Sequence, residues 1–223
     1  MKFPGPEDRP AQYGMCGHIL AMTASGIGVP VPDETSDLWA HTMSRLATTD
    51  GILEATPEVY DHVPVLMGQL NLDPENPALA AAAEGLIIAD RDALSATDLA
   101  GHFQARSREA IHAADLLRFQ APDSVRRSEP LWRQLNALAV TGVYLDCFLD
   151  ARKDAERLTQ FTPAQLVAGS LRRLGGAMRS VEPKTWLSLG KASRQTGFDV
   201  AVAGKVAETL VPFGRTLPTP AEA

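Results

Sequence analysis

The fold is decided by residues Ser128 to Leu158, which read SEPLWRQLNALAVTGVYLDCFLDARKDAERL. Between Leu135 and Leu149, apolar residues fall on every side of a helix, and Asp146 carries the only charge. A helix that is apolar all round belongs at the centre of a protein. The run is too short and too often interrupted by polar residues to span a membrane. We therefore predict one central helix over 128–158, with the rest of the chain packed around it.

One face of this helix changes from apolar to charged along its length. At about 100° per residue, every third or fourth residue falls on the same stripe. The apolar part of the stripe consists of Trp132, Leu135, Ala139, Gly142 and Val143, and the charged part of Asp146, Asp150, Lys153, Asp154 and Arg157. Such a face is typical of one wall of a pocket that has an apolar interior and a polar mouth.

The three aspartates of the stripe are unfavourably placed for ordinary surface residues. Asp146, Asp150 and Asp154 are spaced i, i+4, i+8, so that like charges are neighbours. They lie towards a helix C-terminus, where the helix dipole favours cations. A divalent cation would relieve both penalties, and oxygen ligands without nearby His or Cys favour Mg²⁺ over zinc. The alternative is that Asp150 and Asp154 are solvated and held by Lys153 and Arg157.

The composition indicates an ordinary globular protein. The chain has 223 residues, of which 45% are apolar and 22% charged, enough for one domain with a substantial core. The net charge of −6 gives no reason to expect a nucleic-acid partner. We find no signal peptide and no membrane span, and expect a cytoplasmic protein. We expect a disordered lead-in over 1–10, a single helical domain over 11–214 and a loose tail over 215–223.

The spacing of apolar residues, prolines and glycines predicts an all-α bundle of about eight helices. No stretch alternates between apolar and polar residues as a half-buried strand would. The expected helices are 11–23, 34–54, one opened by Thr56-Pro57 and kinked at Pro64, 77–90 after Asn76, one capped by Ser95 or Thr97 and reaching Phe119, the central helix, one that begins at Pro163 and is interrupted at Gly175-Gly176, and one or two over 184–211 with a break at Gly197.

A second pair of carboxylates occurs on the helix expected over 34–54. Helical spacing places them on the stripe Trp39, Met43, Leu46, Ala47, Asp50 and Glu54, which again runs from apolar to acidic. If successive helices alternate in direction, this helix and the central one point the same way, and both acidic pairs emerge at one end of the bundle. The alternative is that Asp50 and Glu54 lie in solvent at the end of a helix.

Two acidic motifs at helix C-termini, facing each other across an apolar cavity, are the arrangement of class I isoprenoid (terpenoid) synthases. The string YLDCFLD, residues 144–150, resembles the Y-L-D-x-x-x-D motif of tetraprenyl-β-curcumene-synthase-type terpene cyclases. AVTGVYLDCFLDARKDAERL is also similar to the second acidic segment of squalene and phytoene synthases. LATTDGILE is a weaker match to the first motif, without an aspartate next to Asp50.

This resemblance implies a Mg²⁺-dependent enzyme that ionises a prenyl diphosphate in an apolar helical cavity. By the same resemblance Asp146, Asp150, Asp50 and Glu54, with Asp154 nearby, would bind Mg²⁺, and Lys153 and Arg157 would neutralise phosphate charge. The candidate walls of the hydrocarbon cavity are the apolar residues of the two stripes, Trp39, Met43, Trp132, Leu135, Ala139, Gly142 and Val143, for which ordinary helix packing is the alternative. The sequence leaves open whether the protein acts alone or as a homodimer.

Two other functions remain open at this point. Asp98 with His102, and Glu109 with His112, have helical spacings that hold iron in di-iron oxygenases of helical-bundle type. Such a site needs ligands from other helices, and Glu58 with His62 is the only other plausible set. The third possibility is a non-catalytic helical protein that binds an apolar ligand. Arg106, Arg108 and Arg172-Arg173 are either surface charges or additional phosphate contacts.

Overall fold

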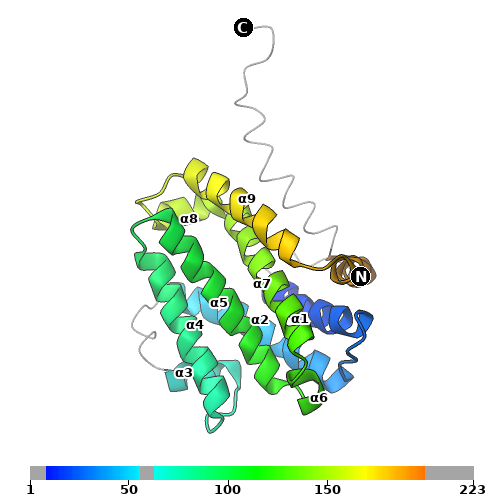
Figure 1. Cartoon of the computed structure of the whole chain (residues 1–223). Coiled ribbons are helices and arrows are strands. Elements are labelled where there is room, and N and C mark those ends of the chain that lie inside the picture. The colour runs from blue at the N-terminus through cyan, green and yellow to red at the C-terminus, as the bar shows by residue number, and fades with distance from the viewer. Residues whose placement is uncertain (1–8, 56–62, 199–223) are drawn as a thin grey trace, which may run out of the picture.

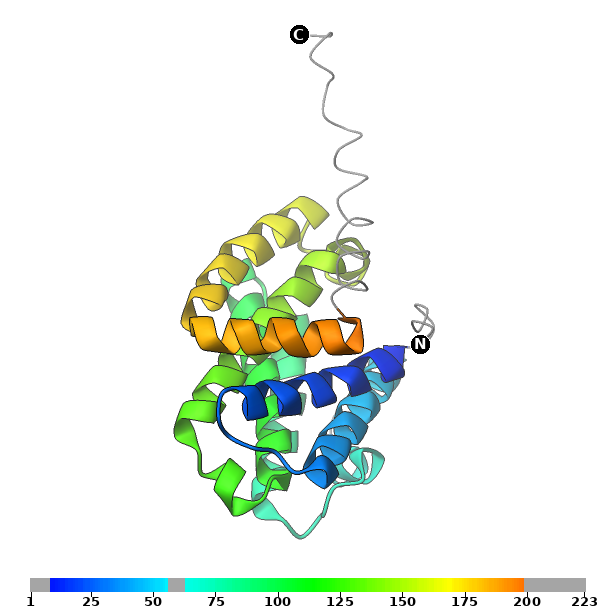
Figure 2. The ribbon, with the colours of Figure 1, turned by 90° about the vertical axis from the view of Figure 1, so that its right-hand side faces the viewer.

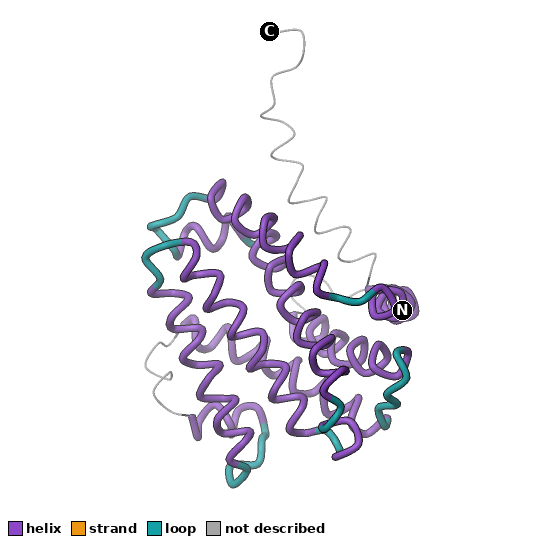
Figure 3. The backbone as a smooth tube through the Cα atoms, in the orientation of Figure 1, coloured by secondary structure: helices purple, strands orange, loops and turns teal. Residues whose placement is uncertain are grey.

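The computed structural model describes residues 9–55 and 63–198, and side chains over 11–48 and 63–198. Helices and the loops between them make up all of the described chain, and none of it is a strand (Figure 3). The expectation of an all-α fold is confirmed. Ten helices occur in the described ranges, which is close to the eight expected. They are α1 Arg9–Gly26, α2 Asp33–Ala55, α3 Val63–Leu70, α4 Pro77–Ser95, α5 Leu99–Gln120, α6 Asp123–Arg126, α7 Glu129–Leu149, α8 Ala151–Arg157, α9 Pro163–Ser180 and α10 Pro183–Thr196.

The bundle is built from helix pairs that pack on α7. Helices α4 and α5 lie side by side, and α7 contacts α5 on one side and α9 on another (Figure 1). Helix α1 packs against α2 and against α10, which runs antiparallel beside it (Figure 2). Gly17 allows the approach of α1 to α2, because a Cβ at this position would lie 2.5 Å from the backbone nitrogen of Ala40.

Helix α7 connects two apolar clusters. Its first half contributes Trp132 and Leu135 to a cluster with α1 and α2, and its second half contributes Tyr144 and Cys147 to a cluster with α5 and α9. The expected central position of this helix is therefore confirmed. It is not buried on every side, because Gly142 in its second half is exposed in the described structure. The apolar sequence alone did not predict this open side.

The central stretch is divided into two helices, which corrects the prediction of one helix over 128–158. Helix α7 ends at Leu149, and Asp150, with φ −99° and ψ 7°, leads into α8. The amide of Asp150 still donates to the carbonyl of Asp146 at 2.8 Å, and the amide of Asp154 to that of Asp150 at 2.9 Å. Because the i to i−4 hydrogen bonds continue through the break, the three aspartates remain one turn apart.

Two further helix boundaries differ from the prediction. Helix α4 continues past residue 90 to Ser95, and Asp98, rather than Ser95 or Thr97, caps α5. The Asp98 carboxylate accepts a hydrogen bond from the amide of Gly101 at 2.7 Å. All three residue types are good N-caps, so the sequence could not choose among them.

The two helix breaks predicted at glycines have opposite outcomes. Helix α9 is not interrupted at Gly175-Gly176, since Leu174 and Ala177 pack on the cluster around Phe103 and hold the helix together. The predicted break at Gly197 is confirmed, because this residue ends α10 with φ 72°. Pro64 is the second residue after the described chain resumes at Val63, so the predicted kink at this position is not tested. The predicted cap Thr56-Pro57 lies outside the described residues.

Candidate functional site

A polar pocket lies where α4, α5, α7 and α8 meet. Its cavity volume is about 40 Å³, which is room for a few water molecules or a phosphate-sized group. The residues that line it are Asp90, Ala93, Leu94, His102, Arg106, Asp146, Asp150, Lys153, Asp154, Arg157 and Leu158. The structure thus brings together all five charged residues that the central stretch was predicted to contribute.

The pocket's position follows from local structure. Asp146 is in the last turn of α7, Asp150 joins the two helices, and Asp154 and Arg157 follow on α8. Continued helical spacing turns all of these side chains towards the same side. Facing them, α5 contributes His102 and Arg106, and the C-terminal half of α4 contributes Asp90.

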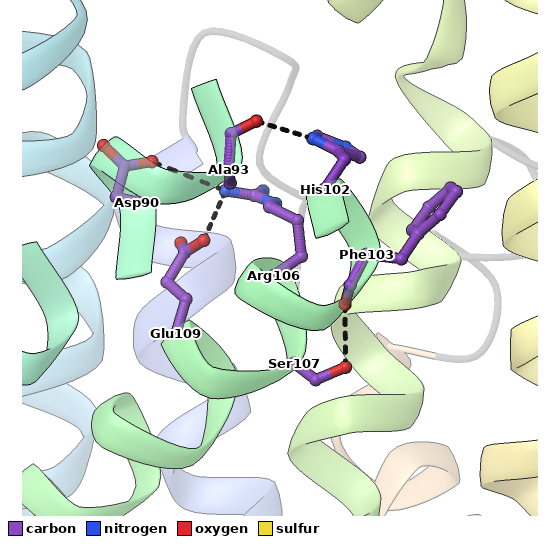
Figure 4. Close-up of polar contacts among 7 residues, drawn as sticks. All are labelled: Asp90, Ala93, His102, Phe103, Arg106, Ser107 and Glu109. Atoms are coloured by element: carbon purple, nitrogen blue, oxygen red, sulfur yellow. Dashed lines mark hydrogen bonds and ion pairs between the residues drawn. The ribbon is translucent and has the colours of Figure 1, made fainter. Parts of the chain in front are cut away.

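Arg106 is a cation of the pocket lining, and Figure 4 shows its guanidinium between the carboxylates of Asp90 and Glu109. Its guanidinium lies 2.5 Å from a carboxylate oxygen of Glu109 and 3.7 Å from one of Asp90, and its side chain is only 20% exposed. Burial opposes its charge, but Glu109 and Asp146 more than compensate, and the pKa of Arg106 lies well above its usual value. Of the two readings that the sequence left open, the structure makes Arg106 a pocket residue and not a surface charge.

The surroundings of Asp154 raise the pKa of its carboxyl group. The pKa of Asp154 is raised to about 6, mainly by burial and also by the charges of Asp146 and Asp150, against the opposing effect of Arg106 and Arg157. An aspartate in water has a pKa near 3.8. Removal from water is thus the main cost of the Asp154 charge, and the neighbouring carboxylates add to it.

The apolar stripe of α7 is divided between core and open space. Trp132 packs edge-on against Trp39 of α2 with ring centroids 5.7 Å apart. Both indole N–H groups donate to backbone carbonyls, that of Trp39 to Leu117 and that of Trp132 to Val125, each at 2.9 Å. These two rings, with Leu135, fill the core and do not line the polar pocket.

The second half of the stripe is more open. Ala139 and Val143 are half-buried, and Met43 on α2 is also half-buried. A Cβ built at Gly142 would meet no atom of the described structure within 4 Å. The described surface of α7 is therefore open at Gly142 and partly open at Ala139 and Val143, one to two turns before Asp146.

The second acidic pair is not tested. Helix α2 reaches Ala55 and so includes Asp50 and Glu54, but their side chains lie outside the described residues. The contact of Trp39 with Trp132 joins α2 and α7 at the apolar ends of their two stripes. Whether the acidic ends also meet stays a prediction.

The residues considered for a di-iron site have other partners. Asp98 caps α5, Glu109 pairs with Arg106, and the ring of His112 packs against Gly85. Nδ1 of His102 bonds to the carbonyl of Ala93 at 2.9 Å. Glu58 and His62 lie outside the described residues.

Within the described ranges, no three His, Cys, Asp or Glu side chains are arranged as a metal-binding group. This does not conflict with the donor chemistry expected of Mg²⁺, which commonly takes one or two carboxylates and completes its shell with water and substrate phosphate oxygens. Asp146 and Asp150, both in the pocket lining, provide such a donor pair.

Comparison with models of known protein families, with curated proteins and with solved structures finds no match. Among the described helices, none is long and apolar enough to cross a membrane.

The sequence did not identify Asp90 as a pocket residue and considered His102 only as an iron ligand. His102 and Arg106 share a spacing of four on α5, which shows that they lie on one helix face. The sequence could not predict that this face turns towards the aspartates, because its direction depends on how α5 packs on α7.

Proposed function

We propose that the protein is a Mg²⁺-dependent enzyme of the class I isoprenoid-synthase type, which ionises a prenyl diphosphate. The observation that carries this proposal is the pocket in which Asp146, Asp150 and Asp154 meet Arg106, Lys153 and Arg157. Few ligands suit both sets of charges. A metal-bound diphosphate does, because its cation pairs with the carboxylates while its phosphate oxygens pair with Lys and Arg.

Asp146 and Asp150 would hold Mg²⁺. The bound ion would neutralise the negative charge that develops on the diphosphate as it leaves. Lys153 and Arg157, exposed at the pocket on α8, can reach the outer phosphate oxygens. Arg106 lies deeper and keeps its positive charge through Glu109 and Asp146. These cations stabilise the leaving group most when its charge is fully developed, which lowers the barrier to ionisation.

The pocket is too small for a prenyl chain, so the hydrocarbon would lie along the open part of α7. Ala139, Gly142 and Val143 are apolar or small and precede Asp146 on the same stripe. The packed Trp39–Trp132 pair closes this stripe at its other end. Apolar contacts between the hydrocarbon and this face of α7 would keep water from the allylic cation.

The test is release of pyrophosphate from ten-, fifteen- and twenty-carbon allylic diphosphates in the presence of Mg²⁺. We expect turnover with at least one of them and its loss when Mg²⁺ is chelated. Asp146→Asn keeps the size of the side chain but removes its charge, and should lower the rate roughly a hundredfold or more, the effect of losing one group that stabilises developing charge.

Glu156→Gln is the matched control, because Glu156 is exposed on α8 and does not line the pocket. It should leave turnover unchanged. The absence of pyrophosphate release with all three substrates, or full activity of Asp146→Asn, would refute the proposed function.

A further inference from the structure

His102 is a buried histidine in the wall of the pocket. The residue is 3% exposed and lies one turn before Arg106 on α5. Its Nδ1 lies 2.9 Å from the carbonyl oxygen of Ala93, at the C-terminal part of α4 (Figure 4). A carbonyl oxygen only accepts hydrogen bonds, so Nδ1 carries the proton in the neutral ring and Nε2 presents its lone pair.

The orientation of the ring is constrained on both sides. The ring of Phe103 packs edge-on against it at 5.1 Å between centroids, and that of Phe161 lies at 5.8 Å. Nε2 is buried and has no hydrogen-bond partner among the described residues. A buried acceptor without a partner costs about 1–3 kcal/mol. No structural role of His102 in the described residues uses this nitrogen.

The surroundings keep the ring neutral. Burial lowers the pKa of His102, and the positive charges of Arg106 and Arg173 lower it further, while the hydrogen bond to Ala93 acts in the opposite direction. Arg173 reaches this region from α9 and lies over the ring of Phe103, 4.7 Å from its centroid. A neutral imidazole with a free lone pair, in a polar pocket, can accept a proton.

We propose that His102 is the proton acceptor that ends the reaction in this pocket. This inference rests on the proposed function, in which the carbon–oxygen bond of the substrate breaks and pyrophosphate leaves with the bonding electrons. A C–H bond on a carbon next to the allylic cation then breaks, its electron pair forms a new C=C bond, and the proton passes to Nε2. The product is a neutral acyclic hydrocarbon in which the new C=C bond is conjugated with the allylic one, and it is called the diene below.

The location of His102 determines which proton is lost. The imidazole lines the same small pocket as Asp146 and Asp150, where the diphosphate end of the substrate would bind. The carbons nearest to the imidazole are those of the allylic end of the chain. A proton can pass from them to Nε2 without the chain folding back. The structure thus favours elimination to an acyclic diene over cyclisation.

The experiment compares wild type with two variants, and separates ionisation from proton transfer. His102→Asn keeps an amide N–H near the position of Nδ1 and removes Nε2, whereas His102→Gln places an amide near the position of Nε2. Pyrophosphate release measures ionisation, and the ratio of diene to prenyl alcohol measures how the cation ends. Because general-base catalysis typically contributes a factor of at least about a hundred, we expect that ratio to fall at least tenfold in both variants.

A second readout does not depend on turnover. In protein with ¹⁵N-labelled histidine, wild type should show Nδ1 protonated and Nε2 unprotonated at neutral pH. Adding a protonated amine analogue of the cation, with Mg²⁺ and inorganic pyrophosphate, should shift the Nε2 resonance of His102, because the ammonium donates to it.

The outcomes are distinguishable. Suppose that wild type releases pyrophosphate. If the product ratio is then unchanged in His102→Asn, or if wild type makes only cyclic or alcohol products, the role of His102 is wrong and the proposed function still stands. An Nε2 that is protonated, or that does not respond to the amine, also overturns it. The absence of pyrophosphate release removes the proposed function and the inference together.

Discussion

At the scale of single residues, Asp154 is a carboxylate whose environment differs clearly from water. Its pKa of about 6 in the folded protein exceeds the ordinary value of 3.8. Between about pH 4 and pH 6 the folded state therefore binds more protons than the unfolded state, and the free energy of unfolding falls as the pH rises through this window. At neutral pH the full penalty is present.

We expect Asp154→Asn to remove this penalty in Mg²⁺-free buffer. At about 1.4 kcal/mol per pKa unit, the free energy of unfolding at pH 7 should rise by about 1–3 kcal/mol, and its decrease between about pH 4 and pH 6 should become shallower. Urea unfolding over this pH range measures both. Glu156→Gln, on the exposed side of α8, should change neither. Lower stability of Asp154→Asn at pH 7 would show that the carboxylate is not under strain.

The charged residues that the central stretch contributes to the pocket could be predicted from the sequence, because Asp146, Asp150 and Asp154 lie on one helical stripe with Lys153 and Arg157. The pocket residues of α4 and α5 could not. Arg106 and His102 are on α5, forty residues or more earlier in the chain. Only the packing of α5 on α7 brings these side chains to the aspartates.

At the scale of helices, Gly17 and Gly142 both lie inside helices, but their surroundings differ. A Cβ at Gly17 of α1 would lie 2.5 Å from the backbone nitrogen of Ala40 and 2.6 Å from its Cα, atoms of α2 that cannot rotate away. A Cβ at Gly142 of α7 would meet no described atom within 4 Å. One position is a helix contact and the other is open.

Gly17→Ala should therefore lower the free energy of unfolding by about 1–3 kcal/mol, the usual cost of overpacking. Gly142→Ala should raise it by about 0.5–1 kcal/mol, because alanine is the better helix former. Thermal or urea unfolding of the two variants checks the pair. Destabilisation by Gly142→Ala would mean that α7 is covered at this position, and that the hydrocarbon has no room there.

Helix starts were easier to predict than helix ends. The starts of α4 after Asn76 and of α9 at Pro163 were predicted correctly. Each helix begins with a proline, and the side chains of Asn76 and Thr162 accept hydrogen bonds from amides of the first turn. The end of the central helix at Leu149 was missed, because the residues on both sides of Asp150 favour helix and nothing in their sequence forces a break.

At the scale of the whole molecule, α7 connects the two halves of the proposed site. Its first half is packed against α1 and α2 around the Trp39–Trp132 contact, and its C-terminal end reaches the polar pocket formed with α4, α5 and α8. The all-α architecture and the central place of this helix could be predicted from apolar periodicity. The direction of the pocket could not, because it depends on contacts between helices far apart in sequence.

The central claim is that this pocket binds a divalent cation together with a diphosphate. The most direct measurement replaces Mg²⁺ with paramagnetic Mn²⁺, which prefers the same oxygen ligands, and adds inorganic pyrophosphate to ¹⁵N-labelled protein. We predict strong broadening of the amide resonances of residues 102–106 and 146–157, no effect over 183–196 in α10, and loss of the broadening in Asp146→Asn. Broadening elsewhere in the molecule, or none at the pocket, would contradict the account.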